Sequence, residues 1–293
     1  MNSPATRPYV WMLVGQMAFA VMATLAHALK DYCSWQVIAV GRSTIPMVLI
    51  ALMAWLAHVH LVVLGTWSLW IRSIAGSISL VCTFYAFTRL PISDVLTITN
   101  LFPVWIALLS WPFLGLRPTM TTWLAILSGV GGVALIQQPH LAEGNLASFA
   151  ALTSSFCSAV AMLGLHRLHA MDTRAIVFHF SAVSLMFSMS AKLFITESVP
   201  SVAPWQWLTV VMLLGVGLTA TIGQICLTKA FTLGDPAKVA VVGLSQVGFG
   251  VIIEVTLWGR RFEWPTILGM ALILSPTAWL MLRGGASAEP HDE

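Results

Sequence analysis

Ten long apolar segments, separated by short polar breaks, run through this chain and predict ten helices that cross a lipid bilayer. At 1.5 Å per residue, about 20 helical residues cross a hydrocarbon core of roughly 30 Å. The breaks carry charges, histidines or prolines and leave no room for a soluble domain. The pattern therefore predicts an all-α membrane protein. Its ten transmembrane helices are expected at residues 8–29, 34–57, 66–88, 92–114, 119–138, 143–166, 173–195, 204–231, 236–258 and 263–283.

The first apolar segment also resembles a secretory signal peptide. Arg7 precedes it, and Ala26-His27-Ala28 at its end resembles a cleavage site. The run from Tyr9 to Leu29 is longer than the apolar region of a signal peptide, which has about 7–15 residues. Further apolar segments follow at once, so we interpret this segment as the first transmembrane helix.

Composition excludes several other classes of protein. The chain of 293 residues is 58% hydrophobic and 9% charged, with a mean hydropathy of +0.87, whereas soluble domains carry roughly 25% charged residues. The net charge of +3 is scattered, so no nucleic-acid partner is expected. The surface is expected to contact lipid, and the chain to act as a monomer or weak homodimer.

The sequence holds no motif for metal, cofactor or catalysis. The four cysteines stand singly, without the spacing of metal ligands, so neither a metal nor a cofactor is expected. Zinc-protease, nucleophile-elbow, dinucleotide and Walker motifs are all missing from the sequence. An enzyme, including an intramembrane enzyme acting on lipid, is therefore not expected, and neither is ATP as a direct driver.

The second half of the chain repeats the first at an offset of 144 residues. Gly115 and Arg117 fall on Gly259 and Arg261, and Ala86-Phe87-Thr88 falls on Ala230-Phe231-Thr232. The ten spans thus form two sets of five, and because five is odd, the second set enters the membrane in the opposite orientation. We expect two inverted repeats at residues 1–138 and 143–283 and a disordered tail at 284–293. Duplicated, inverted bundles are typical of secondary transporters.

An even number of spans places both termini on one side of the membrane. Basic residues favour the cytoplasmic side. The side that holds the N-terminus carries seven of them: Arg7, Arg117, Arg167, Arg174, Lys229, Lys238 and Arg283. The other side carries five: Lys30, Arg89, Lys192, Arg260 and Arg261. The difference favours cytoplasmic termini.

Short motifs resemble the EamA branch of the drug/metabolite transporter superfamily. Leu114-Gly-Leu-Arg-Pro-Thr and Trp258-Gly-Arg-Arg-Phe-Glu resemble the family's turn before the last helix of each half, although Leu116 and Arg260 replace its acidic residue. Phe102-Pro103-Val104 and Arg42-Ser43-Thr44 resemble two further motifs. Within this family the chain is most similar to bacterial amino-acid exporters of the YddG type. The resemblance implies a multi-pass exporter of the bacterial inner membrane.

Ionisable residues inside a span are costly, so each is a candidate for function. Arg42, a third of the way into the second span, is predicted to bind a substrate carboxylate; a clamp on backbone carbonyls or Asp31 is the alternative. His179 is predicted as its counterpart in the second half, or as a satisfied bundle histidine. Glu254 is a candidate for proton coupling, or it anchors the turn by pairing with Arg260 or Arg261. Arg72 is expected to reach back to the membrane interface.

Neutral polar side chains inside the spans suit a zwitterionic substrate. Asn100, Gln246, Tyr85 and Gln224 are predicted to supply hydrogen bonds, and Trp105 an aromatic wall, unless that ring faces lipid. The predicted function is export of amino acids, aromatic and other neutral ones among them, by alternating access. Export of other small metabolites or cationic drugs on the same fold is the alternative.

Overall fold

The structure is a computed structural model that describes residues 6–29, 32–62, 65–87, 89–90, 92–138, 146–194, 207–259 and 263–286. All regular structure in these ranges is α-helical. The helices are α1 (Arg7–Leu29), α2 (Trp35–Leu56), α3 (Trp67–Phe87), α4 (Ile92–Thr99), α5 (Phe102–Leu114), α6 (Met120–Gln137), α7 (Leu146–His166), α8 (Thr173–Phe194), α9 (Trp207–Leu233), α10 (Pro236–Gly243), α11 (Ser245–Trp258) and α12 (Trp264–Ala286).

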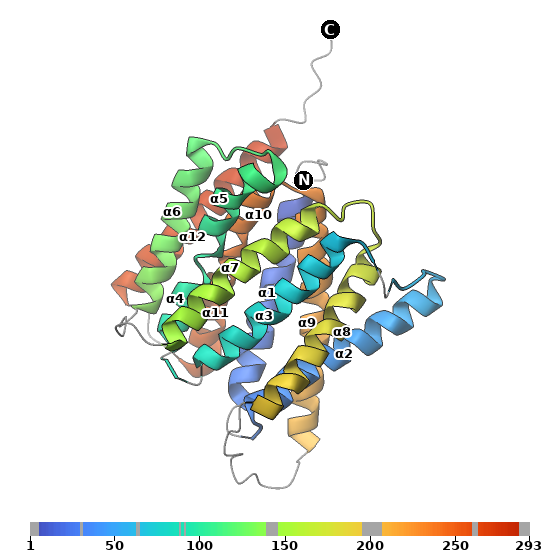
Figure 1. The fold of residues 1–293 in the computed structure, drawn as a ribbon. Helices are drawn as coiled ribbons and strands as arrows, with labels where there is room; N and C mark the ends of the chain where they lie inside the picture. The colour runs from blue at the N-terminus through green and yellow to red at the C-terminus, as the bar shows by residue number, and fades with distance from the viewer. Residues whose placement is uncertain are drawn as a thin grey trace.

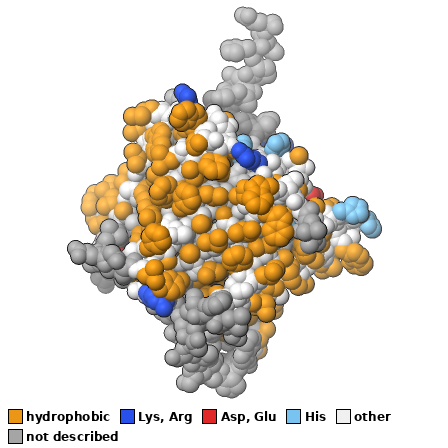
Figure 2. Space-filling view, in the orientation of Figure 1, with side chains coloured by type: hydrophobic (Ala, Val, Ile, Leu, Met, Phe, Trp, Pro, Cys, Tyr) orange, Lys and Arg blue, Asp and Glu red, His pale blue; other side chains and the backbone are white. Residues whose placement is uncertain are grey.

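These helices form ten spans long and apolar enough to cross a membrane, which confirms the predicted fold class. Apolar side chains cover most of one face of the molecule, with only scattered Lys and Arg among them (Figure 2). The prediction for the end of the chain was wrong at one point: α12 continues to Ala286, so residues 284–286 are helical. Residues 287–293 lie outside the described ranges.

Two of the predicted spans are each divided into two helices. The fourth span is interrupted at Asn100-Leu101 and the ninth at Leu244. Leu101 and Leu244 both have right-handed helical dihedrals, and each donates its amide to the carbonyl three residues earlier, so the helix tightens for one turn. Pro103 explains the first break, because it has no N–H to continue the ladder. The two breaks coincide when the halves are superposed on the sequence repeat.

The turns after these spans also repeat. Gly115 and Gly259 cap α5 and α11 with left-handed backbone, at φ 72° and 63°. A residue with a Cβ adopts this conformation at a cost, so the sequence keeps glycine at both places. Asp235 caps α10 by accepting hydrogen bonds from the amides of Ala237 and Lys238, as expected for an acid at a helix start.

The helix contacts stay the same when each helix is replaced by its counterpart in the other repeat. α1 packs on α9, and their counterparts α7 and α3 pack on each other. α2 packs on its counterpart α8, and α6 on its counterpart α12 (Figure 1). At the last contact the Ser128 hydroxyl donates to the carbonyl of Leu272, 144 residues away. A Cβ on either Gly132 or Gly269 would stand 2.6 Å from the other's carbonyl oxygen, so the two backbones touch.

The start of α1 and the end of α12 lie at the same end of the bundle (Figure 1). Basic side chains at this end hold neighbouring elements. The Lys229 ammonium lies 4.2 Å from the centre of the Trp11 ring, and the Arg167 guanidinium donates to the carbonyl of Phe113. We refer to this as the terminal end of the bundle and to the other as the distal end.

Candidate functional site

A cavity of about 750 Å³ lies inside the bundle, between the two repeats. Both halves line it: its lining residues lie on α1 to α6 of the first repeat and on α7 to α11 of the second. Sites for drug-sized ligands have volumes of about 300–1,000 Å³. Its polar lining residues are Gln16, Thr24, His27, Arg42, Arg72, Ser79, Thr83, Thr99, Asn100, Gln137, Ser158, Gln224, Gln246 and Glu254.

The cavity extends towards the distal end of the bundle. His27, Phe84 and Gln137 line it, and each lies in the last turn of a helix that ends there. On the terminal side it is closed by Met12 and Phe231, both almost fully buried. A Cβ at Gly243 would stand 2.7 Å from Met12 Cε, so this side is tightly packed. The cavity thus extends to the end of the bundle that does not hold the termini.

Arg72 lies at the centre of the site and is 1% exposed. The expectation that it reaches the membrane interface was wrong. Its Nη2 donates to Gln224 Oε1 at 3.2 Å, and its Cζ lies 4.1 Å from the centre of the Phe180 ring. Gly76 makes this possible, because a Cβ there would stand 2.5 Å from Arg72 Nη1. The guanidinium is held in one orientation by partners from the second repeat.

Arg42 also lines the cavity, from α2. It borders a small recess of about 10 Å³ together with Phe180 and Gln224, the two residues that hold Arg72. The Nε atoms of Arg42 and Arg72 are buried and have no hydrogen-bond partner among the described residues. No carboxylate of the described chain forms an ion pair with either guanidinium. Asp31, the partner considered from the sequence, lies outside the described residues.

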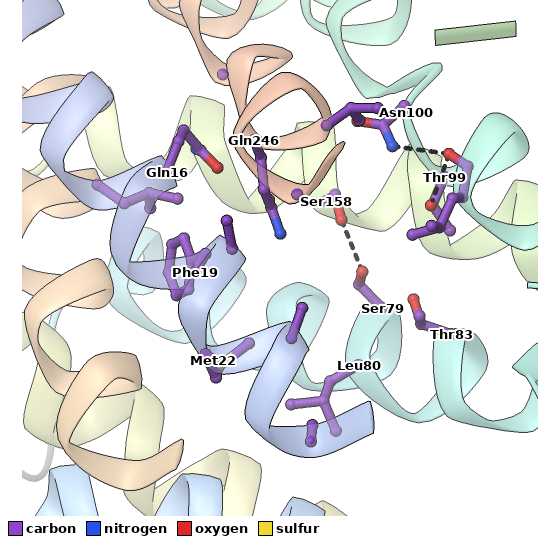
Figure 3. Close-up of a pocket in the computed structure, with 18 of the residues that line it drawn as sticks. Gln16, Phe19, Met22, Ser79, Leu80, Thr83, Thr99, Asn100, Ser158 and Gln246 are labelled. Carbon is purple, nitrogen blue, oxygen red and sulfur yellow. Dashed lines mark hydrogen bonds between the residues drawn. The ribbon is translucent and has the colours of Figure 1, made fainter. Parts of the chain in front are cut away.

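Hydroxyl groups form a polar wall where α3 meets α7. Ser79 Oγ lies 2.9 Å from Ser154 Oγ and 2.7 Å from Ser158 Oγ. Thr83 Oγ1 lies 2.6 Å from Ser154 Oγ, which also donates to the carbonyl of Ser79. Ser79, Thr83 and Ser158 line the cavity together (Figure 3). Sequence reasoning missed this wall, although hydroxyl residues spaced by four positions gave a signal: Ser79 and Thr83 in α3, and Ser154 and Ser158 in α7.

The opposite side of the cavity is mostly apolar. Met12, Phe19 and Met22 from α1 face it, as do Leu227 and Phe231 from α9. Two amides interrupt this surface from the broken spans: Gln246 projects into the open space, and Asn100 donates its side-chain N–H to the carbonyl of Leu96 at 2.7 Å (Figure 3). The cavity is therefore amphipathic, with cationic and hydroxyl groups facing apolar side chains.

Of the predicted site residues, the structure brings five to this cavity: Arg42, Asn100, Gln224, Gln246 and Glu254. Glu254 lines it from the last turns of α11, towards the distal end. Its candidate partners Arg260 and Arg261 lie outside the described residues.

Three predicted site residues do not line the cavity. Tyr85 has the Arg89 guanidinium over its ring at 4.0 Å. Trp105 donates to Ser155 Oγ at 2.8 Å and packs edge-on against Phe156. Trp105 thus joins α5 to α7, whereas Tyr85 contacts an arginine four residues further along its own stretch of chain.

His179 is also placed away from the cavity, where it fits the alternative of a bundle histidine. Its Nδ1 lies 2.8 Å from Ser73 Oγ, and its ring packs edge-on against Trp70. Nearby, the Ser43 and Ser184 hydroxyls meet at 3.2 Å where α2 crosses its equivalent α8.

A two-fold bundle around a central amphipathic cavity defines a membrane transporter rather than a receptor for a surface ligand. A family model for the EamA-like transporter family matches residues 6–138 and 145–282, nearly the whole chain. The chain belongs to this family.

Individual relatives are distant. The Pseudopaline exporter CntI of Pseudomonas aeruginosa is 27% identical over 264 residues, covering 89% of this chain and 91% of the relative. An uncharacterized transporter of Helicobacter pylori is 23% identical, with 90% of each chain covered. Human solute carrier family 35 member G1 is 22% identical over 73% of this chain and 61% of its own.

A solved crystal structure has the same fold. It superposes with a TM-score of 0.81, covering 97% of this chain and 100% of its own, at 17% sequence identity. With its family and its ten apolar spans, the chain is a multi-pass membrane transporter.

Proposed function

We propose that the protein is a secondary transporter that exports amino acids and closely related metabolites across the bacterial inner membrane. The observation that carries this proposal is the pair Arg42 and Arg72, which face a central cavity without a carboxylate partner among the described residues. A guanidinium binds a carboxylate through two parallel hydrogen bonds. An amino acid offers that carboxylate, and its side chain suits the apolar surface around Phe19.

The alternative of a cationic drug as substrate is less compatible with this cavity. Two guanidinium groups repel a cation, and Glu254 is the single described acidic residue on the lining. A larger anionic or zwitterionic metabolite remains a second candidate. The cavity volume favours it, and a relative that covers most of this chain is a Pseudopaline exporter.

Transport by alternating access requires the cavity to close distally and open between Met12 and Phe231. With cytoplasmic termini, the conformation described here is open to the outside. In a variant whose four native cysteines are replaced, Ser158→Cys should react with an impermeant maleimide added outside, and Thr228→Cys, which is fully buried, should not. Labelling of Thr228→Cys alone would contradict this orientation.

Counterflow into proteoliposomes tests the proposed substrate class. Vesicles loaded with an unlabelled amino acid should accumulate the same labelled amino acid, and Arg42→Gln should abolish this accumulation. Arg117→Gln is the matched control, because Arg117 is exposed and lies over Trp111, away from the cavity. If no amino acid exchanges while a cationic drug does, the proposal is wrong.

A proton gradient is the proposed energy source, with Glu254 as the group that exchanges the proton. Glu254→Gln should keep counterflow, which needs no gradient, and lose gradient-driven accumulation. If both activities survive in Glu254→Gln, this residue has no part in coupling.

A further inference from the structure

We infer that the cavity selects substrates with two carboxylates, one bound by Arg42 and the other by Arg72. The substrates of this class are acidic amino acids and amino-acid derivatives with a second acid group. The inference rests on the proposed function and narrows its substrate, since a neutral amino acid supplies only one of the two anions.

The two arginines belong to one site. Arg42 shares the recess beside it with Phe180 and Gln224, and Arg72 stacks on Phe180 and donates to Gln224. Both arginines line the main cavity as well. A single substrate inside the cavity can therefore reach both guanidinium groups.

Neither arginine forms an ion pair with a described carboxylate, although Glu254 lines the same cavity. Arg72 is buried, and its one described hydrogen bond to a side chain goes to the neutral amide of Gln224. Glu254 lies towards the distal end of α11, whereas Arg72 is held in the middle of the bundle beside Gly76. Unpaired charges inside a membrane protein are costly, so two of them side by side favour a dianionic ligand over a monoanionic one.

The arginines are also oriented for binding rather than for holding the bundle together. A structural arginine would donate hydrogen bonds to backbone carbonyls. No carbonyl of the described chain accepts a hydrogen bond from either guanidinium, and the Nε atom of each has no partner there. The Phe180 ring and the missing side chain at Gly76 fix the plane of the Arg72 group. Such a preorganised, planar donor suits a carboxylate bound through both oxygens.

The remaining polar groups suit the rest of an acidic amino acid. The hydroxyl oxygens of Ser79, Thr83 and Ser158 are acceptors for a substrate ammonium group, and they lie on α3 and α7 beside the arginines. The short apolar linker between the two acid groups would pack against Phe19 and Leu80.

The matched pair glutamate and glutamine tests the inference, because the two differ by one carboxylate at nearly the same size. The purified protein in proteoliposomes is expected to bind glutamate about 10- to 100-fold more tightly than glutamine. The measure is the concentration of each compound that inhibits counterflow by half. Arg42→Gln or Arg72→Gln should bring this ratio to within about threefold of one, since each removes one charged hydrogen-bond donor group. Arg117→Gln should leave the ratio unchanged.

Two further measurements keep the inference open to refutation if Arg72→Gln fails to fold. Arg72→Lys keeps the positive charge but loses the planar group that can donate two parallel hydrogen bonds. It should retain part of the preference for glutamate over glutamine. Stabilisation of the detergent-purified protein against heating should likewise be larger with glutamate than with glutamine.

The outcomes separate this inference from the proposed function. Equal transport of glutamate and glutamine would overturn the two-carboxylate inference and leave amino-acid export intact. Transport of glutarate, a dicarboxylate without an amine, in the absence of any amino-acid transport would overturn the proposed function and support the two-anion site. If neither dicarboxylate nor amino acid exchanges or stabilises the protein, both are wrong.

Discussion

The contact of α1 with α9 and the contact of α3 with α7 occupy equivalent places in the two repeats, yet different forces hold them. Ser79 of α3 falls on Gly223 of α9 at the repeat offset. Ser79 meets Ser154 and Ser158 through hydrogen bonds, whereas Gly223 meets Gly15 and Phe19 through close apolar packing. The two partner residues are four positions apart in each contact, Ser154 and Ser158 in α7 and Gly15 and Phe19 in α1. The two contacts therefore use the same face of equivalent helices.

The comparison shows how a duplicated bundle acquires an amphipathic site. Small residues lie at both contacts, which lets the helices approach closely in lipid. One contact carries hydroxyl groups, and at the other the Phe19 ring packs against a glycine. Because both contacts border the cavity, one wall becomes polar and the other apolar without any change in the fold.

The largest effect is expected from crowding the apolar contact. A Cβ at Gly15 would stand 3.0 Å from Cys226 Cβ and 3.4 Å from the carbonyl oxygen of Gly223. Gly15→Leu should separate α1 from α9 and destabilise the protein by about 3 kcal/mol or more. The measurements are monodisperse yield and melting temperature in detergent. Gly131→Leu is the control, since nothing lies within 4 Å of its Cβ position.

A second large effect is expected at Gly76, beside the polar wall. Its Cβ would stand 2.5 Å from Arg72 Nη1 and 2.8 Å from Phe180 Cε2. Gly76→Ala should displace the guanidinium and lower the affinity for substrate about tenfold, as misplacement of a binding group does. Counterflow measures the affinity, and Gly131→Ala serves as its control. If the affinity for substrate is unchanged in Gly76→Ala, Arg72 does not contribute to substrate binding.

The polar contact should tolerate change better than the apolar one. Ser154→Ala removes the hydroxyl that joins Ser79 to Thr83 and should cost about 1 kcal/mol of stability. Thr153→Ala is the control, because the exposed hydrogen bond of its hydroxyl goes only to the carbonyl of Phe149 in its own helix. If Ser154→Ala lowers stability as much as Gly15→Leu does, the two contacts do not differ in their tolerance of change.

The smallest effect is expected where equivalent helices meet each other. Ser128→Ala removes the hydrogen bond to Leu272 and should lower stability by about 0.5 kcal/mol, the typical strength of a hydrogen bond between membrane helices. Thermal unfolding of this variant is compared with that of Thr256→Ala, in which the lost hydroxyl bonds only its own helix. A cost above that of Ser154→Ala would reverse the proposed order.

Hydrophobic pattern and the repeat were enough to predict the ten spans, because each span is governed by its own composition. The interruption at Leu244 escaped prediction, since no proline or charge marks it and the helix only tightens for a turn. Three of the five neutral polar and aromatic candidates, Asn100, Gln224 and Gln246, line the cavity. The sequence indicated them because a polar group inside an apolar span needs a reason. Tyr85, Trp105 and the cationic candidate His179 have such reasons within the bundle instead.

Arg72 shows most clearly what the sequence withholds. Counting residues from the start of α3 places it near the interface, and long basic side chains usually reach for water from there. Its side chain turns inward because Gly76, one helical turn further along, has no side chain to block it. There it packs on the Phe180 ring and donates a hydrogen bond to Gln224, both of which belong to the second repeat. Contacts between residues more than a hundred positions apart are invisible to a local pattern.

The close approach of Gly132 and Gly269 sets the spacing of α6 and α12. A Cβ at either position would stand 2.6 Å from the carbonyl oxygen of the other glycine. A single methyl group added at either glycine would therefore have to widen the gap between the last helices of the two repeats.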